Sequence, residues 1–271
     1  MDGNNCISLL YGRLGNILFQ LAAGLSYSKK YKKEFHCIIK NKDITPYSEY
    51  KFFAEMFPDE NIVKCSRYCV IKEDQYNIPK QLKPVKGNVL LDGYFQSDIY
   101  IDKEYIRELF AICDIERINL KWKYTITDET VGISVRRGDY LKKENRSIFN
   151  VLSKNFYKDV YKKYFNGLKC IVSSDDIDWC KKNFDFIDAV YIDNDSVTDM
   201  RILSLCKHHI LSSSTFSWWS SWLEEKTDSI NIVPNPWFKN DSGLIGSYVA
   251  PKNWIREYVK PEYIWKDDKN D

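Results

Sequence analysis

Short apolar runs alternate with amphipathic stretches along most of the chain, and this alternation restricts the fold more than any other feature. The runs are as short as buried strands, and the stretches between them carry apolar residues at helical spacing. Strands that alternate with helices are typical of βαβ units, whose parallel sheet is covered by helices. We therefore predict an α/β protein.

The first half of the chain contains two clear strands. Residues 6–11 form the first strand, which leads through GRLGN into a helix that opens near Asn16. Residues 89–92 form the second strand, which ends in GYFQS and precedes a helix over residues 103–112. Residues 43–86 between them are weakly patterned.

The second half is more regular and predicts five strands, each followed by a loop and a helix except the last. The expected strands are residues 131–135, 170–172, 190–193, 209–211 and 230–233, and the expected helices are 156–165, a segment ending at 184, 198–207 and a segment ending at 224. Residues 115–130 are polar without a clear period. We place the domain boundary there, giving domains 1–125 and 126–271.

Composition excludes several classes of function. A net charge of +2 provides no basic field for nucleic acid. The eight cysteines are scattered without a C-x-x-C pair, and only three histidines are present, so we expect neither disulfides nor a metal site. The N-terminus lacks a secretion signal, and no apolar stretch is long enough to span a membrane. We expect a soluble, cytoplasmic protein.

Polar chemistry follows three of the strands in the second half. After the strand 131–135 comes RRGDY, where Arg136 and Arg137 carry permanent charges whose forked geometry matches phosphate oxygens. Each charge-assisted hydrogen bond contributes roughly 1.5–3 kcal/mol. Gly138 allows a close backbone approach, and Asp139 could orient an arginine or accept a proton. A surface cluster of ion pairs explains the same residues.

The second polar junction is SSDD, residues 173–176. A carboxylate at this place, Asp175, could accept two hydrogen bonds from a guanine edge or a ribose. The simpler interpretation is that Ser174 or Asp175 caps the following helix.

The third polar junction is SSSTFSWW, where Ser213, Ser214 and Thr215 lie at the passage from strand to helix and Phe216 follows. Hydroxyls and backbone N–H groups at a helix N-terminus bind phosphate. Capping combined with core packing explains this stretch equally well.

In parallel sheets the loops after the strands collect at one edge, so we expect the three junctions to meet. Together they predict a site for a nucleoside diphosphate. In the first half, Gly12 and Gly15 of GRLGN lack the full dinucleotide-binding spacing. A turn with Asn16 as the helix N-cap is the alternative.

These motifs resemble, in order and over most of the chain, the inverting fucosyltransferases that use GDP-fucose, and most closely the α-1,2-fucosyltransferases. The matching elements are GRLGN-x-x-FQ, GYFQS, VRRGDY, SDD-I-x-W, the DMRxLSLCKHxI block with SSST-FSWW, and VPNPWF. One such motif has little weight, but several in register are difficult to obtain by chance.

The resemblance implies a GT-B type glycosyltransferase with two Rossmann-like domains facing a central cleft, needing no metal or other cofactor. The C-terminal domain would hold GDP-fucose and the N-terminal domain a galactose-containing glycan acceptor. Arg136 and Arg137 would neutralise the diphosphate, Asp175 would contact guanine, and Asn16 would close on the donor. Phosphate would lie among Ser213, Ser214 and Thr215, with Ser174 and Phe216 also on the donor. The accompanying loop positions are Gly12, Arg13, Gly15, Ser134, Gly138 and Tyr140.

Two positions depart from the family pattern. Ser134 stands where a histidine usually precedes the two arginines, and Ile17 replaces a glutamine. Without that histidine, Asp139 is the best candidate for the base, and orienting Arg136 is its equally supported alternative role. A positioned base typically contributes roughly 10²–10⁴-fold.

Three other interpretations remain. The chain could transfer fucose in another linkage, such as α-1,6 or to protein oxygen. It could bind the sugar nucleotide without catalysis, since Ser134 replaces the histidine. It could also be an adhesion protein, because RRGDY contains Arg-Gly-Asp, although a buried strand precedes that tripeptide.

Overall fold

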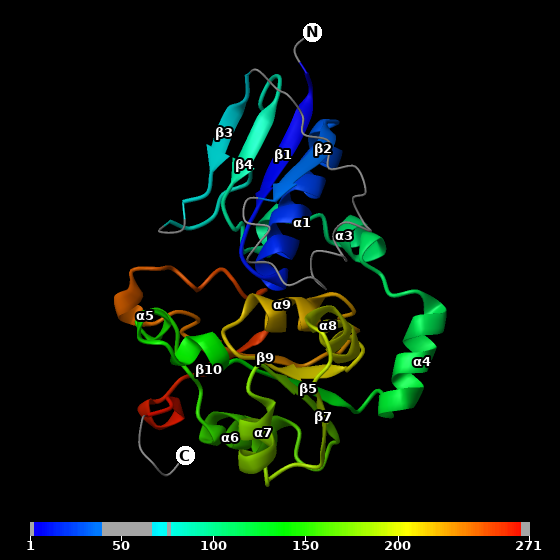
Figure 1. Cartoon of the computed structure of the whole chain (residues 1–271), viewed down its shortest axis with the longest axis vertical. Helices are drawn as coiled ribbons and strands as arrows, with labels where there is room; N and C mark the ends of the chain where they lie inside the picture. Colours follow the sequence, from blue (N-terminus) through cyan, green and yellow to red (C-terminus); the bar gives the residue numbers. More distant parts are fainter. Residues whose placement is uncertain (1–2, 40–66, 75–76, 267–271) are drawn as a thin grey trace. The chain divides into compact units, whose positions relative to one another are not determined.

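The computed structural model describes residues 3–39, 67–74 and 77–266. The chain divides into two compact units, Met1–Phe110 and Ala111–Asp271, each built on its own parallel sheet (Figure 1). This division precedes the boundary that we placed at residues 125 and 126. The reason is that helix α4 (Asp114–Tyr124) packs on the second unit, where Leu120 and Tyr124 contact a core cluster that includes Ile171 and Leu203.

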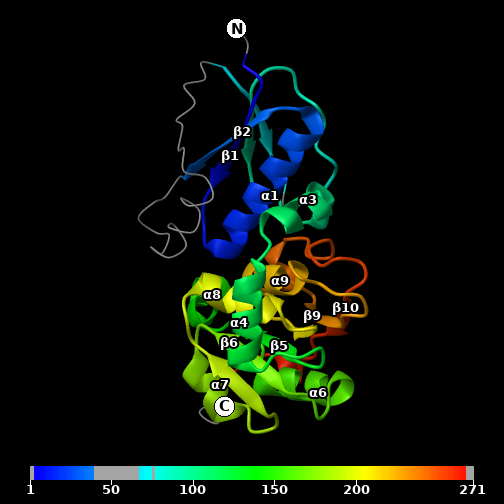
Figure 2. The same cartoon turned by 90° about the vertical axis from the view of Figure 1, so that its right-hand side faces the viewer.

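The first unit has a four-stranded sheet in the order β2-β1-β4-β3. Its long helix α1 lies along the sheet in both views (Figures 1 and 2). The strands are β1 (Asn5–Leu10), β2 (Glu34–Ile39), β3 (Cys69–Lys72) and β4 (Val89–Asp92), and the helical segments are α1 (Leu14–Tyr31), η1 (Asp98–Tyr100) and α3 (Lys103–Leu109).

Strands β1 and β4 were predicted, whereas β2 and β3 were not. Both missed strands are at the edges of the sheet, and β3 exposes half of Val70, so neither presents a continuous apolar run. Helix α3 ends at Leu109, before the expected residue 112, because Ile112 is buried in the core of the second unit. Most of the weakly patterned segment 43–86, together with the charged C-terminal tail, lies outside the described residues.

The second unit has a six-stranded parallel sheet in the order β10-β9-β8-β5-β6-β7. Its strands are β5 (Val131–Val135), β6 (Cys170–Ser174), β7 (Ala189–Ile192), β8 (His208–Ile210), β9 (Asn231–Asn235) and β10 (Ile255–Tyr258). Besides α4, its helices are α5 (Lys143–Arg146), α6 (Lys154–Tyr164), α7 (Ile177–Asn183), α8 (Ser196–Ser204) and α9 (Thr215–Trp222), with 3₁₀ turns η2 (Gly138–Leu141), η3 (Asn240–Ser242) and η4 (Pro261–Tyr263).

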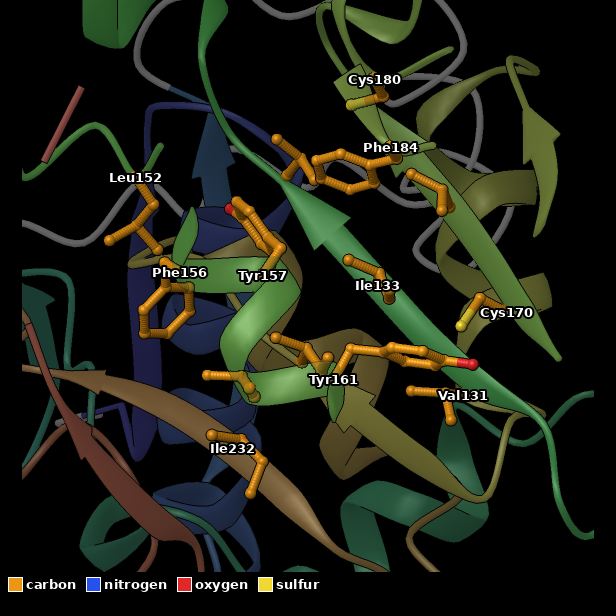
Figure 3. Packing of buried hydrophobic residues seen from close by; sticks show 14 of the residues in the cluster. Val131, Ile133, Leu152, Phe156, Tyr157, Tyr161, Cys170, Cys180, Phe184 and Ile232 are labelled. Atoms are coloured by element: carbon orange, nitrogen blue, oxygen red, sulfur yellow. The ribbon is translucent and has the colours of Figure 1, made fainter. Parts of the chain in front are cut away.

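The five strands expected in this unit are present, and β10 is an additional, mostly exposed edge strand. On one face of the sheet Val131 and Ile133 pack with Phe156 and Tyr157 of α6 (Figure 3). On the other face Ile171 packs with residues of α8. Burial on both faces gives the central strands their continuous apolar runs, which is why the sequence reveals them.

The strand order reverses at β5. From β5 the chain builds outward through β6 and β7, then crosses back to place β8 on the opposite side of β5. In open parallel sheets a reversal of this kind leaves a crevice at the carboxyl ends of the strands, where ligands bind. The loops that follow β5, β6 and β8 all begin at these carboxyl ends.

Candidate functional site

The structure brings together the three polar junctions that the sequence singles out in the second unit. The Tyr140 hydroxyl of the loop after β5 donates a 2.9 Å hydrogen bond to the Ser213 carbonyl of the loop after β8. The Arg137 amide donates to Asp175 Oδ1 of the loop after β6 at 2.8 Å. We refer to these three loops, residues 136–142, 174–176 and 211–214, as the β5 edge.

Arg136 is oriented by two carboxylates. Its Nη2 lies 2.6 Å from Asp139 Oδ1 and its Nη1 lies 3.1 Å from Asp175 Oδ2. The Arg136 side chain remains 22% exposed. A forked cation held from both sides is preorganised, which reduces the side-chain entropy that is lost when an anion binds.

Arg137 differs from its neighbour because it is almost completely buried, with 4% of its side chain exposed. Its Nε lies 3.1 Å from Asp176 Oδ2, and its guanidinium carbon lies 3.8 Å from the Trp179 ring centroid and 5.3 Å from that of Trp265. Its Nη1 is buried without a hydrogen-bond partner among the described residues. The two arginines therefore have different environments despite their adjacency.

Gly138 is required by the close approach of the two loops. A Cβ atom at this position would lie 2.3 Å from Asp175 Oδ2 and 2.8 Å from its Cγ. Any side chain would therefore displace the carboxylate that holds Arg136. Asp175 Oδ1 accepts from the Arg137 amide, and Asp175 Oδ2 pairs with the Arg136 guanidinium. A carboxylate has lone pairs for further donors.

The cap of α7 is Asp176, and neither of the residues that we considered for this role occupies it. Asp176 Oδ1 accepts from the Trp179 amide, and the Ser174 hydroxyl accepts from the Asp176 amide at 3.0 Å. The capping interpretation was thus right about the motif and wrong about the residue. Asp175 is left to organise the arginine loop.

The third junction forms the N-terminus of α9. Ser214 is the N-cap, and its side chain makes no capping hydrogen bond; Thr215 is the first helical residue. Ser213 Oγ is buried and has no hydrogen-bond partner among the described residues. Phe216 is partly exposed and packs on the core cluster beside α8. Backbone donors at such an uncapped end favour an anion.

Ser134 has a structural environment that the sequence did not predict. Its hydroxyl accepts a 2.7 Å hydrogen bond from Ser217, whose hydroxyl lies 2.9 Å from that of Ser212. All three side chains are buried. This hydroxyl chain joins β5, the loop after β8 and α9, so Ser134 fixes the helix that carries Ser214 and Thr215.

Tyr140 is also fixed in the β5 edge. Its ring stacks on Phe149 with centroids 4.2 Å apart, and burial raises the pKa of its hydroxyl. The hydroxyl therefore stays protonated and acts as the donor to Ser213. It positions the loop that contains Arg136 relative to α9.

The predicted residues of the first unit lie at the carboxyl end of β1. Gly12 has a φ of +91°, a left-handed conformation that favours glycine. Arg13 is exposed and is the N-cap of α1, while Gly15 is buried in its first turn. Asn16 therefore lies inside the helix, and the alternative interpretation of Asn16 as the N-cap is wrong. Its Oδ1 instead accepts from Gln96 Nε2 of the GYFQS loop at 3.0 Å.

Sequence reasoning missed an aromatic and acidic group at this end of the first sheet. The rings of Tyr11 and Tyr94 meet edge to face with centroids 4.9 Å apart. Glu73 Oε2 accepts from the amides of Tyr94 and Phe95, both at 2.7 Å. Burial, followed by the nearby Asp92 carboxylate, raises the pKa of Tyr11. GYFQS was a visible signal, whereas Glu73 lies in the weakly patterned segment and gave none.

Comparison with known proteins identifies the chain's family. The model for glycosyl transferase family 11 matches residues 9–257. The chain belongs to this family. The family-11 chain is 28% identical to the alpha-1,2-colitosyltransferase of Escherichia coli over 92% of its own length and 98% of that protein. It is 30% identical to human galactoside alpha-(1,2)-fucosyltransferase 1, but there the match spans 49% of this chain and only 35% of the human protein.

Solved structures agree on the fold of this family-11 chain. The fucosyltransferase NodZ from Bradyrhizobium covers 82% of it with a TM-score of 0.54 at 13% identity, and POFUT1 in complex with GDP covers 85% with a TM-score of 0.50 at 12% identity. The predicted α/β fold of GT-B type and the predicted fucosyltransferase family are both confirmed. Within the described ranges, no helix combines the length and apolarity needed to cross a bilayer.

Proposed function

We propose that this chain transfers L-fucose from GDP-β-L-fucose to the 2-hydroxyl of a terminal galactoside, with inversion at the anomeric carbon. One observation carries the donor half of this proposal. The partly exposed, doubly held Arg136 and the N-terminus of α9 belong to loops that are hydrogen-bonded to each other where the strand order reverses.

In the proposed donor complex, Arg136 contacts the diphosphate, and Ser213, Ser214 and Thr215 supply hydroxyl and backbone donors around it. Arg137 lies against the rings of Trp179 and Trp265, supports the loop and adds a second positive charge nearby. Asp175 contacts the guanine edge beside Ser174 and Phe216.

The reaction is a displacement at the anomeric carbon. The acceptor oxygen forms a bond to C1 while the bond from C1 to the phosphate oxygen breaks, and GDP leaves with that electron pair. Negative charge develops on the diphosphate, so a preorganised guanidinium stabilises the transition state more than the ground state. Arginine suits this role because it cannot lose its proton.

The acceptor hydroxyl also loses a proton, and Asp139 is the candidate carboxylate. In that role Oδ2 accepts the proton while Oδ1 keeps Arg136 in place. Asp139 Oδ1 lies 2.6 Å from Arg136 Nη2 and so fixes one side of the guanidinium. The geometry therefore supports orientation of Arg136 as the principal role of Asp139.

We place the acceptor at the group formed by Tyr11, Tyr94, Asp92 and the amides of Asn16 and Gln96 in the first unit. Tyrosine rings present flat apolar faces to the C–H groups of a sugar, and carboxylate and amide groups bind its hydroxyls. Glu73 fixes the loop by accepting from two successive amides. Such a site suits a neutral glycan.

Transfer of colitose is the second candidate. It is favoured by the similarity to the Escherichia coli alpha-1,2-colitosyltransferase, which extends over nearly the full length of both chains. Fucose transfer in another linkage would use the same donor and give a different product, and binding without catalysis would give no product.

The test is to incubate the full chain with labelled GDP-fucose, lactose and EDTA, then to separate the products. We expect a fucosylated trisaccharide whose linkage methylation analysis or NMR assigns to the 2-hydroxyl of galactose. A parallel reaction with the nucleotide sugar of colitose ranks the two donors. Measurable GDP binding without transfer to any galactoside would contradict the proposed activity.

A further inference from the structure

Helix α4 presents an apolar stripe to solvent. Ile115, Ile118 and Trp122 are 74%, 65% and 87% exposed, and their spacing of three and four residues places them on one side of the helix. Views from two directions show α4 on the outside of the second unit (Figures 1 and 2). Single exposed apolar residues are ordinary, but three in line on one helix are typical of an interaction surface.

The opposite side of α4 attaches the helix to its own unit, and this fixes the position of the stripe. Arg117 Nη2 donates to Glu224 Oε1 at 2.9 Å, and Arg201 Nη1 donates to Glu116 Oε1 at 2.8 Å. Leu120 and Tyr124 pack on the core beside α8. The polar residues of α4 are thus partly used to attach it to its own unit, while large apolar side chains face water.

The charges at the two ends of α4 are opposite. Asp114 lies in the first turn with 96% of its side chain exposed, and Lys121 and Lys123 lie in the last turn. If two α4 helices pair antiparallel with residues 118 and 119 at the centre, Ile115 lies opposite Trp122 of the other copy. Asp114 and Lys121 are seven residues apart and share one flank of the stripe, so Asp114 lies beside Lys121 of the other copy. A parallel arrangement would instead place like charges together.

We propose that α4 is a self-association surface, through which two copies of this chain pair about a two-fold axis close to Ile118 and Asn119. A two-fold axis makes both copies use the same patch, so the surface has to be complementary to itself. The order acidic, apolar, basic along α4 meets that requirement. One short helix per copy forms a small interface compared with the roughly 1,600 Å² of stable complexes, so we expect a weak dimer in rapid exchange.

Sedimentation velocity over a concentration series at low salt tests the proposal. We expect the wild-type chain to shift from monomer to dimer as its concentration rises, and Trp122→Glu to stay monomeric. Ile78→Glu is the matched control, since Ile78 is 70% exposed elsewhere on the chain. A wild type that remains monomeric throughout, or a Trp122→Glu variant that associates like the wild type, would overturn the proposal.

Charge reversal tests the antiparallel register. Asp114→Lys alone and Lys121→Asp alone each create two repulsive contacts, so each variant should self-associate roughly tenfold more weakly than the wild type. An equimolar mixture of the two variants restores two attractive contacts and should form dimers again. If the mixture stays as weak as its components, the register is wrong. Circular dichroism and GDP affinity should be unchanged in both variants, which separates this result from the proposed transferase function.

Discussion

The two units carry different chemistry at equivalent places. Each has a parallel sheet with polar groups after the carboxyl ends of its strands. In the second unit these groups are arginines held by carboxylates, together with serine hydroxyls and the N-terminus of a helix. In the first unit they are a tyrosine pair, an amide pair and a carboxylate that binds backbone amides.

This difference shows how the same sheet architecture can present binding groups for two unlike ligands. The β5 edge provides fixed positive charge and hydrogen-bond donors, which suit the anionic donor that we propose. The edge of the first unit provides flat rings with both donors and acceptors, which suit a neutral sugar. Variants in the two edges should therefore separate donor effects from acceptor effects.

Arg136→Ala should have the largest effect, and it tests the donor side of this comparison. Loss of one preorganised donor to a developing anion costs about 10²–10³-fold in rate. We expect kcat/KM for GDP-fucose to fall by about that factor in a steady-state transfer assay. Arg136→Lys should recover only part of the loss, because an ammonium group lacks the planar fork. Full activity in Arg136→Lys would contradict two-point binding.

Gly138→Ala should disturb the same edge indirectly. The new Cβ would occupy the position of the Asp175 carboxylate, so Arg136 would lose one of its two partners. We expect a loss of about 1–3 kcal/mol in the free energy of unfolding. Urea denaturation checks the stability, and a donor titration should show a raised KM for GDP-fucose. A variant with unchanged donor KM would show that Asp175 does not need to hold Arg136.

Tyr94→Ala tests the acceptor side of the comparison. Removing the ring eliminates its contact with Tyr11 and the proposed platform for the sugar. We expect the KM for the galactoside to rise by about tenfold, on the basis of roughly 1–1.5 kcal/mol for an aromatic contact, while the KM for GDP-fucose stays unchanged. Tyr94→Phe is the matched control, since it keeps the ring. An effect on the donor KM alone would place the acceptor elsewhere.

Ser134→Ala should have the smallest effect. It removes the acceptor of the Ser217 hydroxyl, which still contacts Ser212. We expect a loss of about 1 kcal/mol in the free energy of unfolding and little change in turnover. Ser134→His should be more destabilising, because the position is buried against α9. A Ser134→His variant that is as stable as the wild type and turns over faster would contradict the structural role of this serine.

The sequence was most informative where burial is greatest. The central strands of the second sheet are apolar on both faces and were predicted, whereas the edge strands β2, β3 and β10 are partly exposed and were missed. Helix α4 was missed for a related reason. Its solvent-facing residues are apolar, so the amphipathic pattern that reveals most helices is blurred.

The site could be predicted as a set of loops and not as a set of contacts. Parallel topology brings RRGDY, SSDD and SSST to one edge whatever the details of packing. Which aspartate caps α7, and which hydroxyl receives the bond from Ser217, depends on side-chain conformations that only the folded chain determines. The different environments of Arg136 and Arg137 arise in the same way, because Trp179 and Trp265 lie far from them in sequence.

Isothermal titration calorimetry of GDP against the wild type, Arg136→Ala and Tyr94→Ala tests the central claim most directly. If the β5 edge binds the donor through Arg136, Arg136→Ala should weaken GDP binding by about hundredfold, since the charge-assisted bonds it removes contribute roughly 1.5–3 kcal/mol each. Tyr94→Ala should bind GDP like the wild type. Unchanged GDP affinity in Arg136→Ala would contradict the account.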